Sequence, residues 1–531
     1  MKKLSFLTRV SLLLGFFFTL DKLLAFARTI IILRQFQLSS QLDSFYFADL
    51  LPSWEVAIFS GSALAMAMIP VLTQTLTLRG RESAWNLFSR VANLAFLVTG
   101  IGAALAALFA LPIVRFWIAP GLSAQQQLFT AGLMRIDLIG TFIFSISGLV
   151  IAALQANQHF FLPALAPIMY NVGQIFGAAI LAPSHSYSIG RITIPAFGLG
   201  VYGLVYGVIL GAALHLAIQI PGLIRYGFRW TASLDLRDPA LVEMFKVLWP
   251  RLLTVLGVQL MFMARANLAS RFGQTGAFSA ITNGWMIMQV PETLLGTAIA
   301  TAILPTLSEF AARADWNGFR QTIEKALQVL IALTLPAGAI MAAGMHPLIR
   351  AAFHLDEAGA NLLTATARVY MLTLCGYAIQ EIAARALYAR KEALIPLATI
   401  VVRLVVYLAI GISTLLFFES IGAPAIAFAE ISLTVEAVVM LIILSRRMKE
   451  SIKIDGSLLK GLAAALFGGG AAYGLAVMLP GGAVITAILG MIAGTIIALV
   501  IVNKEVRLFL KLGMDENSES PNAVEYNNRH V

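Results

Sequence analysis

The stretch Asp21–Arg34, DKLLAFARTIIILR, decides the fold class because it places charged side chains inside a long apolar segment. The surrounding run begins near Phe6 and has the length of a helix that crosses a bilayer. A charged side chain in the middle of such a helix is costly unless it faces a water-filled cavity or a partner. Asp21, Lys22 and Arg28 are therefore candidate functional residues.

The composition of the whole chain agrees with a membrane protein. Of 531 residues, 59% are hydrophobic and 12% are charged, and the mean hydropathy is +0.85. One globular core cannot bury this much apolar surface. The net charge of +10 is spread between the apolar runs, so we do not predict nucleic-acid binding. The single cysteine, Cys375, lies in an apolar run and excludes a disulfide framework.

The apolar runs predict about fourteen membrane-spanning helices. The N-terminal run is predicted to be a retained first helix, because Asp21 and Lys22 interrupt it and no cleavage site for a signal peptide follows. The predicted spans are 6–33, 43–77, 84–117, 125–156, 161–183, 197–224, 242–272, 276–309, 319–350, 360–389, 394–418, 421–445, 458–480 and 482–503.

The positions of the basic residues predict the orientation. They gather at one set of alternate span ends, including Lys2, Lys3, Arg446 and Arg447, and are fewer at the opposite ends. By the positive-inside rule, both termini are expected in the cytoplasm, which requires an even number of spans. The polar tail, 504–531, is expected to be disordered.

An internal repeat organises the chain. Gly61–Leu72, GSALAMAMIPVL, matches Gly296–Leu307, GTAIATAILPTL, so that Pro70 meets Pro305. Other pairs keep the same order at offsets of 231 to 237 residues: Ala27-Arg28 with Ala264-Arg265, Trp85-Asn86-Leu87-Phe88 with Trp316-Asn317-Gly318-Phe319, Arg135 with Arg368, and Ala153-Leu154-Gln155-Ala156 with Ala386-Leu387-Tyr388-Ala389.

The repeat predicts two parallel lobes, because each copy has six spans and therefore enters the membrane from the same side. We expect a binding site between the lobes, as in alternating-access transporters. The predicted domains are 1–226 (helices 1–6), 227–450 (helices 7–12), 451–503 (a C-terminal helix pair) and 504–531 (the cytoplasmic tail). The predicted fold class is thus an all-α polytopic membrane protein.

No nucleotide-binding loop, metal-ligand cluster or nucleophile motif is evident, so we predict neither an enzyme nor a cofactor or metal. What remains is the set of ionisable residues inside the predicted spans. They are Asp21, Lys22, Arg28, Asp43, Asp49 and Glu55 in the first two spans, and Arg265, Glu292, Glu381, Arg385, Arg403, Glu430 and Glu436 in the second half.

Five of these residues are predicted to bind substrate: Lys22, Arg28, Asp43, Glu55 and Arg265. Arg28 and Arg265 are related by the repeat, which favours a symmetric pair that lines one cavity. The planar guanidinium group suits a diphosphate because it binds phosphate oxygens in a bidentate way. A structural ion pair with a neighbouring helix is the alternative for Arg28, and a solvated role is the alternative for Asp43. Glu55 follows Pro52, which loosens the helix.

Several motifs resemble the MurJ (MviN) family of lipid II flippases. They are Lys22-Leu23-Leu24-Ala25-Phe26-Ala27-Arg28, Leu42-Asp43-Ser44-Phe45, Leu51-Pro52, Ile69-Pro70-Val71-Leu72, Leu304-Pro305-Thr306-Leu307-Ser308, and Leu387-Tyr388-Ala389-Arg390 with Pro396. The resemblance covers nearly the whole chain. It implies fourteen helices, two six-helix lobes and a C-terminal pair that forms a groove for the lipid tail. It also implies the multidrug/oligosaccharidyl-lipid/polysaccharide exporter superfamily.

The chain departs from the family pattern at three places. Ser53-Trp54-Glu55-Val56-Ala57 and Trp285-Met286-Ile287-Met288-Gln289 lack arginines that members typically carry there, and Lys22 replaces an arginine. Some members bind sodium through acidic and amide side chains on helices seven and eleven. Here helix eleven carries Arg403 and no carboxylate, so we predict no metal site.

The predicted function is that of a cytoplasmic-membrane flippase for a polyprenyl-diphosphate-linked saccharide, with the peptidoglycan precursor lipid II as the expected substrate. Membrane lipids and cell-wall synthesis proteins are the expected partners. The alternatives are a flippase for another lipid-linked glycan, a drug exporter, or a membrane scaffold in cell-wall assembly that has lost transport. A membrane glycosyltransferase is less favoured because it needs carboxylate-bearing loops near the interface.

Overall fold

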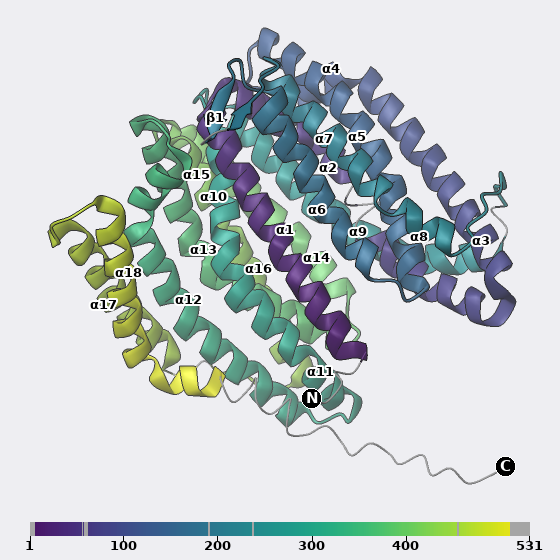
Figure 1. Ribbon diagram of the computed structural model, residues 1–531. Coiled ribbons are helices and arrows are strands. Elements are labelled where there is room, and N and C mark those ends of the chain that lie inside the picture. Colours follow the sequence, from purple (N-terminus) through teal and green to yellow (C-terminus); the bar gives the residue numbers. More distant parts are fainter. Residues whose placement is uncertain are drawn as a thin grey trace. The chain divides into compact units, whose positions relative to one another are not determined.

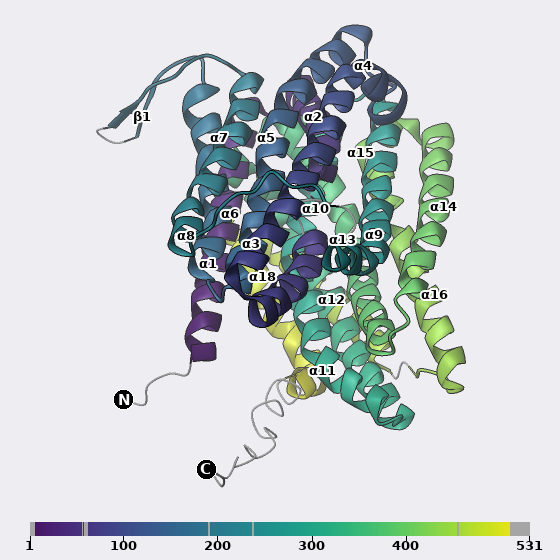
Figure 2. The ribbon, with the colours of Figure 1, turned by 90° about the vertical axis from the view of Figure 1, so that its right-hand side faces the viewer.

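The computed structural model describes residues 6–55, 57, 62–189, 192–235, 238–453 and 456–509. Almost all of the described chain is helical (Figure 1). The exception is a short antiparallel hairpin, β1 (Tyr187–Ile189) with β2 (Ile192–Ile194), which projects past the end of α7 (Figure 2). The predicted all-α class is confirmed, whereas most of the predicted tail lies outside the described residues.

The helices follow one another closely along the chain. Those of the N-terminal half are α1 (Phe6–Phe36), α2 (Ser40–Glu55), α3 (Ser62–Leu108), α4 (Ala110–Ile113), η2 (Val114–Ile118), α5 (Ala124–Ala156), α6 (Phe161–Phe176), η3 (Gly177–Leu181), α7 (Val201–Ala217) and α8 (Ile220–Arg225). Those that follow are α9 (Pro239–Ser270), α10 (Ala277–Glu292), η4 (Thr293–Thr297), α11 (Ala298–Ala312), α12 (Trp316–Phe353), α13 (Glu357–Ala389), α14 (Leu394–Phe417), η5 (Glu419–Ile421), α15 (Ala423–Phe428), α16 (Ile431–Met448), α17 (Ser457–Met478) and α18 (Ala483–Ile501).

Twelve helical segments of the described chain are long and apolar enough to cross a membrane. They correspond in order to the third to fourteenth predicted spans. The first two predicted spans correspond to α1, which has 31 residues, and to α2 with the start of α3. The chain is therefore a multi-pass membrane protein.

The predicted break between the second and third spans occurs inside α3. α3 consists of two helical segments that meet at a kink. Gly80 lies at the kink with non-helical backbone angles, φ 82° and ψ 176°. A positive φ is easily adopted by glycine, which has no Cβ, and is strained for other residues. Gly80 therefore marks the turn that the sequence predicted between 77 and 84.

The helices form two compact units. The first comprises residues up to Thr282 together with Ala352–Gly359 and Gly411–Ile426, and the second comprises Asn283–Ala351, Ala360–Ile410 and the residues from Ala427 onward. These units are groups of helices in contact and differ from the predicted lobes, which are copies of one sequence pattern. The division into two lobes and a helix pair stays a prediction.

Matching local contacts accompany the internal repeat. Arg135 Nε donates a hydrogen bond to the Ala107 carbonyl oxygen at 3.0 Å, and Arg368 Nε donates to the Ala342 carbonyl oxygen at 2.8 Å. The internal repeat thus relates the two arginines to each other, and it also relates their two carbonyl acceptors to each other. Edge-to-face ring pairs also recur, with centroids 5.8 Å apart in both copies: Trp85–Phe88 and Trp316–Phe319.

The C-terminal end of α1 meets the end of α12 and the segment that follows it, and we call this contact the first junction. Arg34 Nε donates to the Ala352 carbonyl oxygen at 2.8 Å. The Gln37 carboxamide donates to the His354 carbonyl oxygen at 3.2 Å and accepts from the Asp356 amide at 2.9 Å. Side chains at one helix end thus satisfy backbone groups of the other segment.

A second junction has the same form and joins the C-terminal end of α9 to the end of η2 and the segment that follows it. Asn267 Nδ2 donates to the Trp117 carbonyl oxygen at 2.8 Å, and Ser270 Oγ accepts from the Gly121 amide at 3.2 Å. Trp117 and Ala352, the carbonyl acceptors of the two junctions, are 235 residues apart, which lies within the repeat offset.

Glycines allow α6 and η3 to approach α7 at backbone distance. A Cβ atom on Gly173 would lie 2.3 Å from Gly211 Cα, and one on Gly177 would lie 2.5 Å from Gly207 Cα. Both distances are far below van der Waals contact. Gly203, Gly207 and Gly211 therefore form the packing face of α7.

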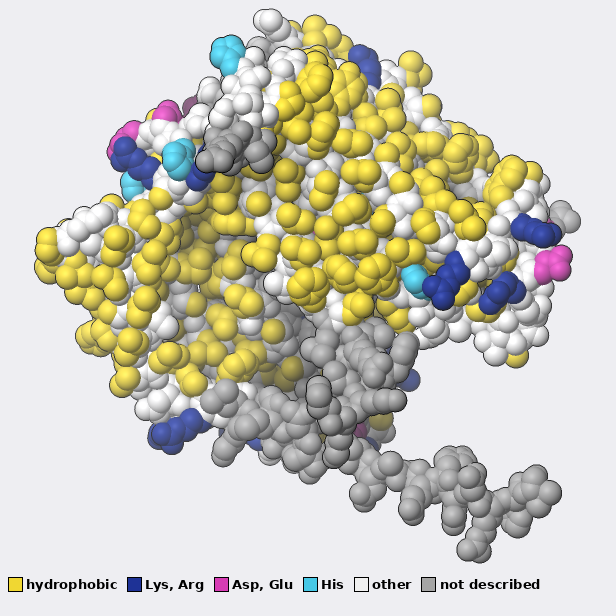
Figure 3. All heavy atoms as spheres, in the orientation of Figure 1, with side chains coloured by type: hydrophobic (Ala, Val, Ile, Leu, Met, Phe, Trp, Pro, Cys, Tyr) yellow, Lys and Arg dark blue, Asp and Glu magenta, His cyan; other side chains and the backbone are white. Residues whose placement is uncertain are grey.

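The C-terminal pair α17 and α18 also packs through small residues. A Cβ atom on Gly468 would lie 2.8 Å from the Gly494 carbonyl oxygen. Their other faces are strongly apolar, with Met478 82% and Val500 67% exposed. Hydrophobic side chains also cover most of the molecular face in Figure 3. Such surfaces suit contact with lipid tails.

Candidate functional site

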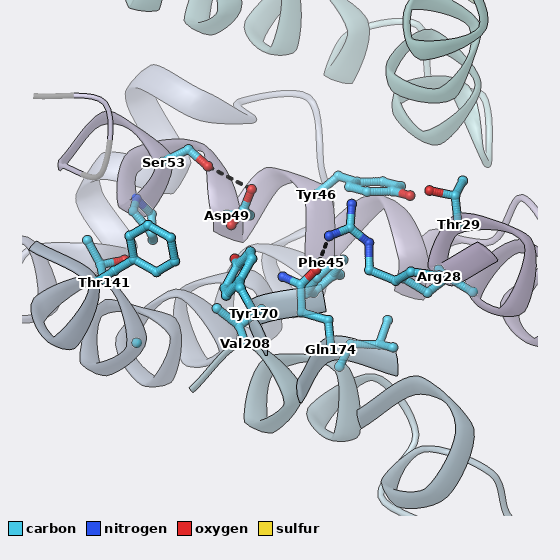
Figure 4. Close-up of a pocket in the computed structure, with 15 residues that line it drawn as sticks. Arg28, Thr29, Phe45, Tyr46, Asp49, Ser53, Thr141, Tyr170, Gln174 and Val208 are labelled. Atoms are coloured by element: carbon cyan, nitrogen blue, oxygen red, sulfur yellow. Dashed lines mark hydrogen bonds between the residues drawn. The ribbon is translucent and has the colours of Figure 1, made fainter. Parts of the chain in front are cut away.

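A cavity of about 290 Å³ lies inside the first unit, among α1, α2, α5, α6 and α7. These helices are neighbours in the fold: α1 packs on α6, and α2 packs on α5 and α7. The lining combines aromatic rings with polar groups from four helices, α1, α2, α5 and α6 (Figure 4). The polar side chains are Arg28, Thr29, Tyr46, Asp49, Ser53, Thr141, Tyr170 and Gln174.

Two amide side chains of α6 hold Arg28. Its guanidinium group donates to Asn171 Oδ1 at 3.1 Å and to Gln174 Oε1. Among the side chains that the structure describes, no carboxylate lies within ion-pair distance of Arg28. The amides fix the position of the guanidinium group without neutralising its charge.

Asn171 also links Arg28 to Asp21, an acid that lies earlier on α1. Its Nδ2 atom donates to Asp21 Oδ1 at 2.8 Å while its Oδ1 atom accepts from Arg28. Asp21 and Arg28 lie seven residues apart, about 10 Å along a helix, so they do not reach each other directly. The structural alternative for Arg28 is therefore an amide bridge and not a direct ion pair.

The opposite wall of the cavity is acidic. Asp49, on α2, accepts a hydrogen bond from Ser53 Oγ at 2.8 Å. The Asp137 carboxyl group, on α5, lies within hydrogen-bonding reach of Asp49 and is 1% exposed. Tyr170, on α6, lies beside Asp49 in Figure 4. The cavity thus brings Arg28 and Asp49 together, and Asp137 is buried beside Asp49.

Lys22 and Arg265 do not line this cavity. The Lys22 side chain is 64% exposed and its Nζ atom lies 3.6 Å from Asp21 Oδ2. Arg265 is buried on α9, and its guanidinium group lies 5.1 Å from the centroid of the Phe262 ring. Their predicted contacts with substrate stay predictions.

Asp43 holds the start of α10. Its carboxylate accepts from the Gly276 amide at 2.7 Å, from the Ser279 amide at 2.7 Å and from Ser279 Oγ at 2.6 Å. A carboxylate at a helix N-terminus satisfies amides that lack a partner within the helix. This role differs from the predicted one in substrate binding, which nothing here tests. The side chain of Glu55 lies outside the described residues.

Replacing Asp43 with alanine is expected to destabilise the protein. The change leaves the buried amides of Gly276 and Ser279 unpaired, and each such group costs about 1–3 kcal/mol. Thermal unfolding of the purified protein in detergent measures the loss. Asp315→Ala is the matched control, because Asp315 Oδ1 accepts from the Gly318 amide at 3.0 Å at an exposed helix start. An equal fall in both variants contradicts the prediction.

Two partly buried arginines of the second unit pair with carboxylates. Arg403 lies 2.9 Å from Glu430 Oε2 and 3.8 Å from Glu436 Oε2, and both glutamates are buried. Arg385 pairs with Glu381 one turn earlier on α13. These arginines therefore contact acids directly, in contrast with Arg28, which contacts amides.

Several residues of the cavity were not chosen from the sequence. Asn171 and Gln174 are neutral, and a polar amide in an apolar helix carries no sign that it faces an arginine. Asp137 carried a usable signal, because it is an acid inside the predicted span 125–156. Asp49 was recognised as such an acid but was not assigned to the site.

The comparisons with known proteins agree with this architecture. The family model described as "Lipid II flippase MurJ" matches residues 34–506. The chain is 28% identical over 401 residues to the lipid II flippase MurJ of Burkholderia cenocepacia, covering 73% of this chain and 74% of that protein. It is 25% identical over 393 residues to the probable lipid II flippase MurJ of Vibrio cholerae serotype O1, covering 71% of each.

Solved structures share the fold. A structure of lipid II flippase MurJ in an inward closed conformation matches with a TM-score of 0.74 at 17% identity, covering 93% of this chain and all of that chain. An inward-facing MATE family transporter of the MOP superfamily matches with a TM-score of 0.64 at 15% identity, covering 81% and 94%. These likenesses concern the fold alone.

Proposed function

The chain belongs to the lipid II flippase MurJ family, and from this membership we propose that it moves lipid II from the inner to the outer leaflet by alternating access. Lipid II is a polyprenyl-diphosphate-linked saccharide and the precursor of peptidoglycan. A flippase moves a lipid without changing its covalent bonds, so the protein is a transporter and not an enzyme. The cell-wall synthesis proteins expected from the sequence stay candidate partners.

The observation that carries the proposed mechanism is the state of Arg28. Its guanidinium group lies at a cavity inside the membrane helices and is held by neutral amides. A diphosphate needs positive partners in a low-dielectric region, because an unpaired buried charge is strongly unfavourable. Arg28 supplies a fixed charge and a bidentate donor for this purpose.

Arg265 and Lys22 complete the proposed diphosphate site. Arg265 is the repeat counterpart of Arg28, and Lys22 lies on α1 less than two turns before Arg28. Their positive charges assist Arg28 while the substrate passes. Complementation of a bacterial cell depleted of its own lipid II flippase tests the function. Failure of the well-expressed protein to restore growth rejects it.

We also propose that both termini lie in the cytoplasm. The basic residues gather at alternate span ends, and this asymmetry predicts orientation. Reporter fusions at Lys3 and Asn528 are expected to give a cytoplasmic readout at both sites. An external readout at either site contradicts the proposed topology.

A further inference from the structure

Two neighbouring carboxyl groups, one at the cavity and one buried beside it, have no role in the diphosphate grip. Asp49 on α2 and Asp137 on α5 lie within hydrogen-bonding reach of each other. Asp137 is 1% exposed, and neither of its carboxyl oxygens has a donor among the described residues. Asp49 lines the cavity and accepts one hydrogen bond from Ser53.

Two carboxylates in contact, one of which is buried, do not both remain ionised, because their repulsion and the desolvation of the buried group are unfavourable. One shared proton removes a charge and converts the contact into a hydrogen bond. It also gives the buried Asp137 carboxyl group the partner that the described side chains do not provide. The geometry of the pair therefore calls for one bound proton.

We propose that Asp49 and Asp137 form a proton-binding site, and that this proton is bound together with the lipid diphosphate at Arg28. The second part rests on the proposed function. Loss of the proton leaves two negative charges on the wall that faces Arg28. These charges repel a diphosphate and compete with it for the guanidinium group. Proton and substrate thus favour each other, and the coupling is reciprocal.

Other titratable groups near the pair define the controls. Arg28 on α1 and Tyr170 on α6 interact electrostatically with Asp49. Asp21 reaches Arg28 through Asn171. On α7, His215 stacks on the cavity residue Phe144 with centroids 4.3 Å apart, and its Nδ1 atom lies 2.6 Å from Ser147 Oγ. His215→Gln therefore separates histidine titration from that of the carboxyl pair.

Infrared spectroscopy of the purified full-length protein tests the proton site without substrate. The wild type at neutral pH is expected to show the band of a protonated carboxyl group. The band weakens in Asp137→Asn, because Asp49 then ionises at the cavity, and it shifts in Asp49→Asn, because the buried Asp137 carboxyl group keeps the proton and loses its carboxylate partner. Glu309→Gln, at an exposed ion pair with Arg313, is the control. Spectra of the two asparagine variants that match the wild type overturn the site.

Binding of lipid II across a pH series tests the coupling. Each phosphate of this diester is strongly acidic, so the ligand keeps its charge over the series. The dissociation constant of the wild type is expected to fall by up to about tenfold for each unit that the pH is lowered, the limit for one linked proton. Asp137→Asn and Asp49→Asn are expected to lose this slope, whereas His215→Gln and Glu309→Gln keep it.

The outcomes separate the two proposals. A wild type that binds lipid II equally at every pH overturns the coupling, and so does a slope that persists in both asparagine variants. A wild type that does not bind lipid II at all rejects the proposed function, while the infrared experiment still decides the proton site. If one asparagine variant does not fold, the other decides both experiments.

Discussion

Replacement of Arg28 with alanine is expected to abolish lipid II flipping while the protein is still produced and folded. The guanidinium group is held by Asn171 and Gln174, which leave its charge uncompensated for a diphosphate. Loss of one partner from a buried charged pair costs about 2–5 kcal/mol, or at least about 30-fold in affinity. Arg28→Lys is expected to retain part of the activity, because it keeps the charge and loses the bidentate geometry.

Transport of fluorescent lipid II in vesicles, together with complementation, measures this effect. Arg135→Ala is the matched control, because Arg135 lies outside the cavity and donates to a backbone carbonyl. Arg265→Ala is expected to be similarly severe if Arg265 shares the grip. Full transport by an Arg28→Ala, Arg265→Ala double variant discards the diphosphate-grip hypothesis.

A structural role for Arg28 makes a different prediction. In that case, Arg28→Ala lowers the yield of folded protein, and Asp21→Asn restores it by removing the acid that Asn171 links to Arg28. Yield and transport measured in the same preparations distinguish the two roles.

Replacement of Gly177 with leucine is expected to prevent folding. A Cβ atom at this position would lie 2.5 Å from Gly207 Cα and 2.6 Å from the Gly203 carbonyl oxygen. The obstacles are backbone atoms, so no side-chain rotation relieves the overlap. Overpacking of this kind typically costs about 1–3 kcal/mol and more where the backbone must move. The displaced segment continues directly from Gln174, so Arg28 also loses its support.

The yield of monodisperse protein after extraction in detergent measures the loss. Gly132→Ala on α5 is the control, because a Cβ atom there meets nothing within 4 Å. Its yield is expected to equal or exceed that of the wild type, since alanine favours helix more than glycine does. Normal yield from Gly177→Leu contradicts the packing described for η3 and α7.

The sequence predicted the helical architecture well, because apolar runs of span length have few alternatives in a bilayer. The repeat was also readable, since Arg135 and Arg368 keep equivalent hydrogen bonds in the structure. The hairpin of β1 and β2 was not predicted. Its strands have three residues each, which is too short for a periodic pattern.

The site was less predictable than the fold. A charge inside a span identified Arg28, but the sequence does not say which face of a neighbouring helix meets it. The rotation of each packed helix about its own axis determines which side chains face its neighbours. It places Asn171 and Gln174 toward Arg28, and Asp137 toward Asp49. For Asp43, the same reasoning predicted a substrate contact, and the structure shows that its carboxylate caps α10. Its predicted contact with substrate stays untested.

The first and second junctions connect the two copies of the repeat by reciprocal contacts. In each junction, the end of one helix in one copy of the repeat binds the segment after a helix in the other copy. Reciprocal contacts of this kind define an isologous interface, which in separate subunits belongs to a two-fold symmetric dimer. The two copies of the repeat therefore meet through the contact geometry of a two-fold symmetric pair within one polypeptide.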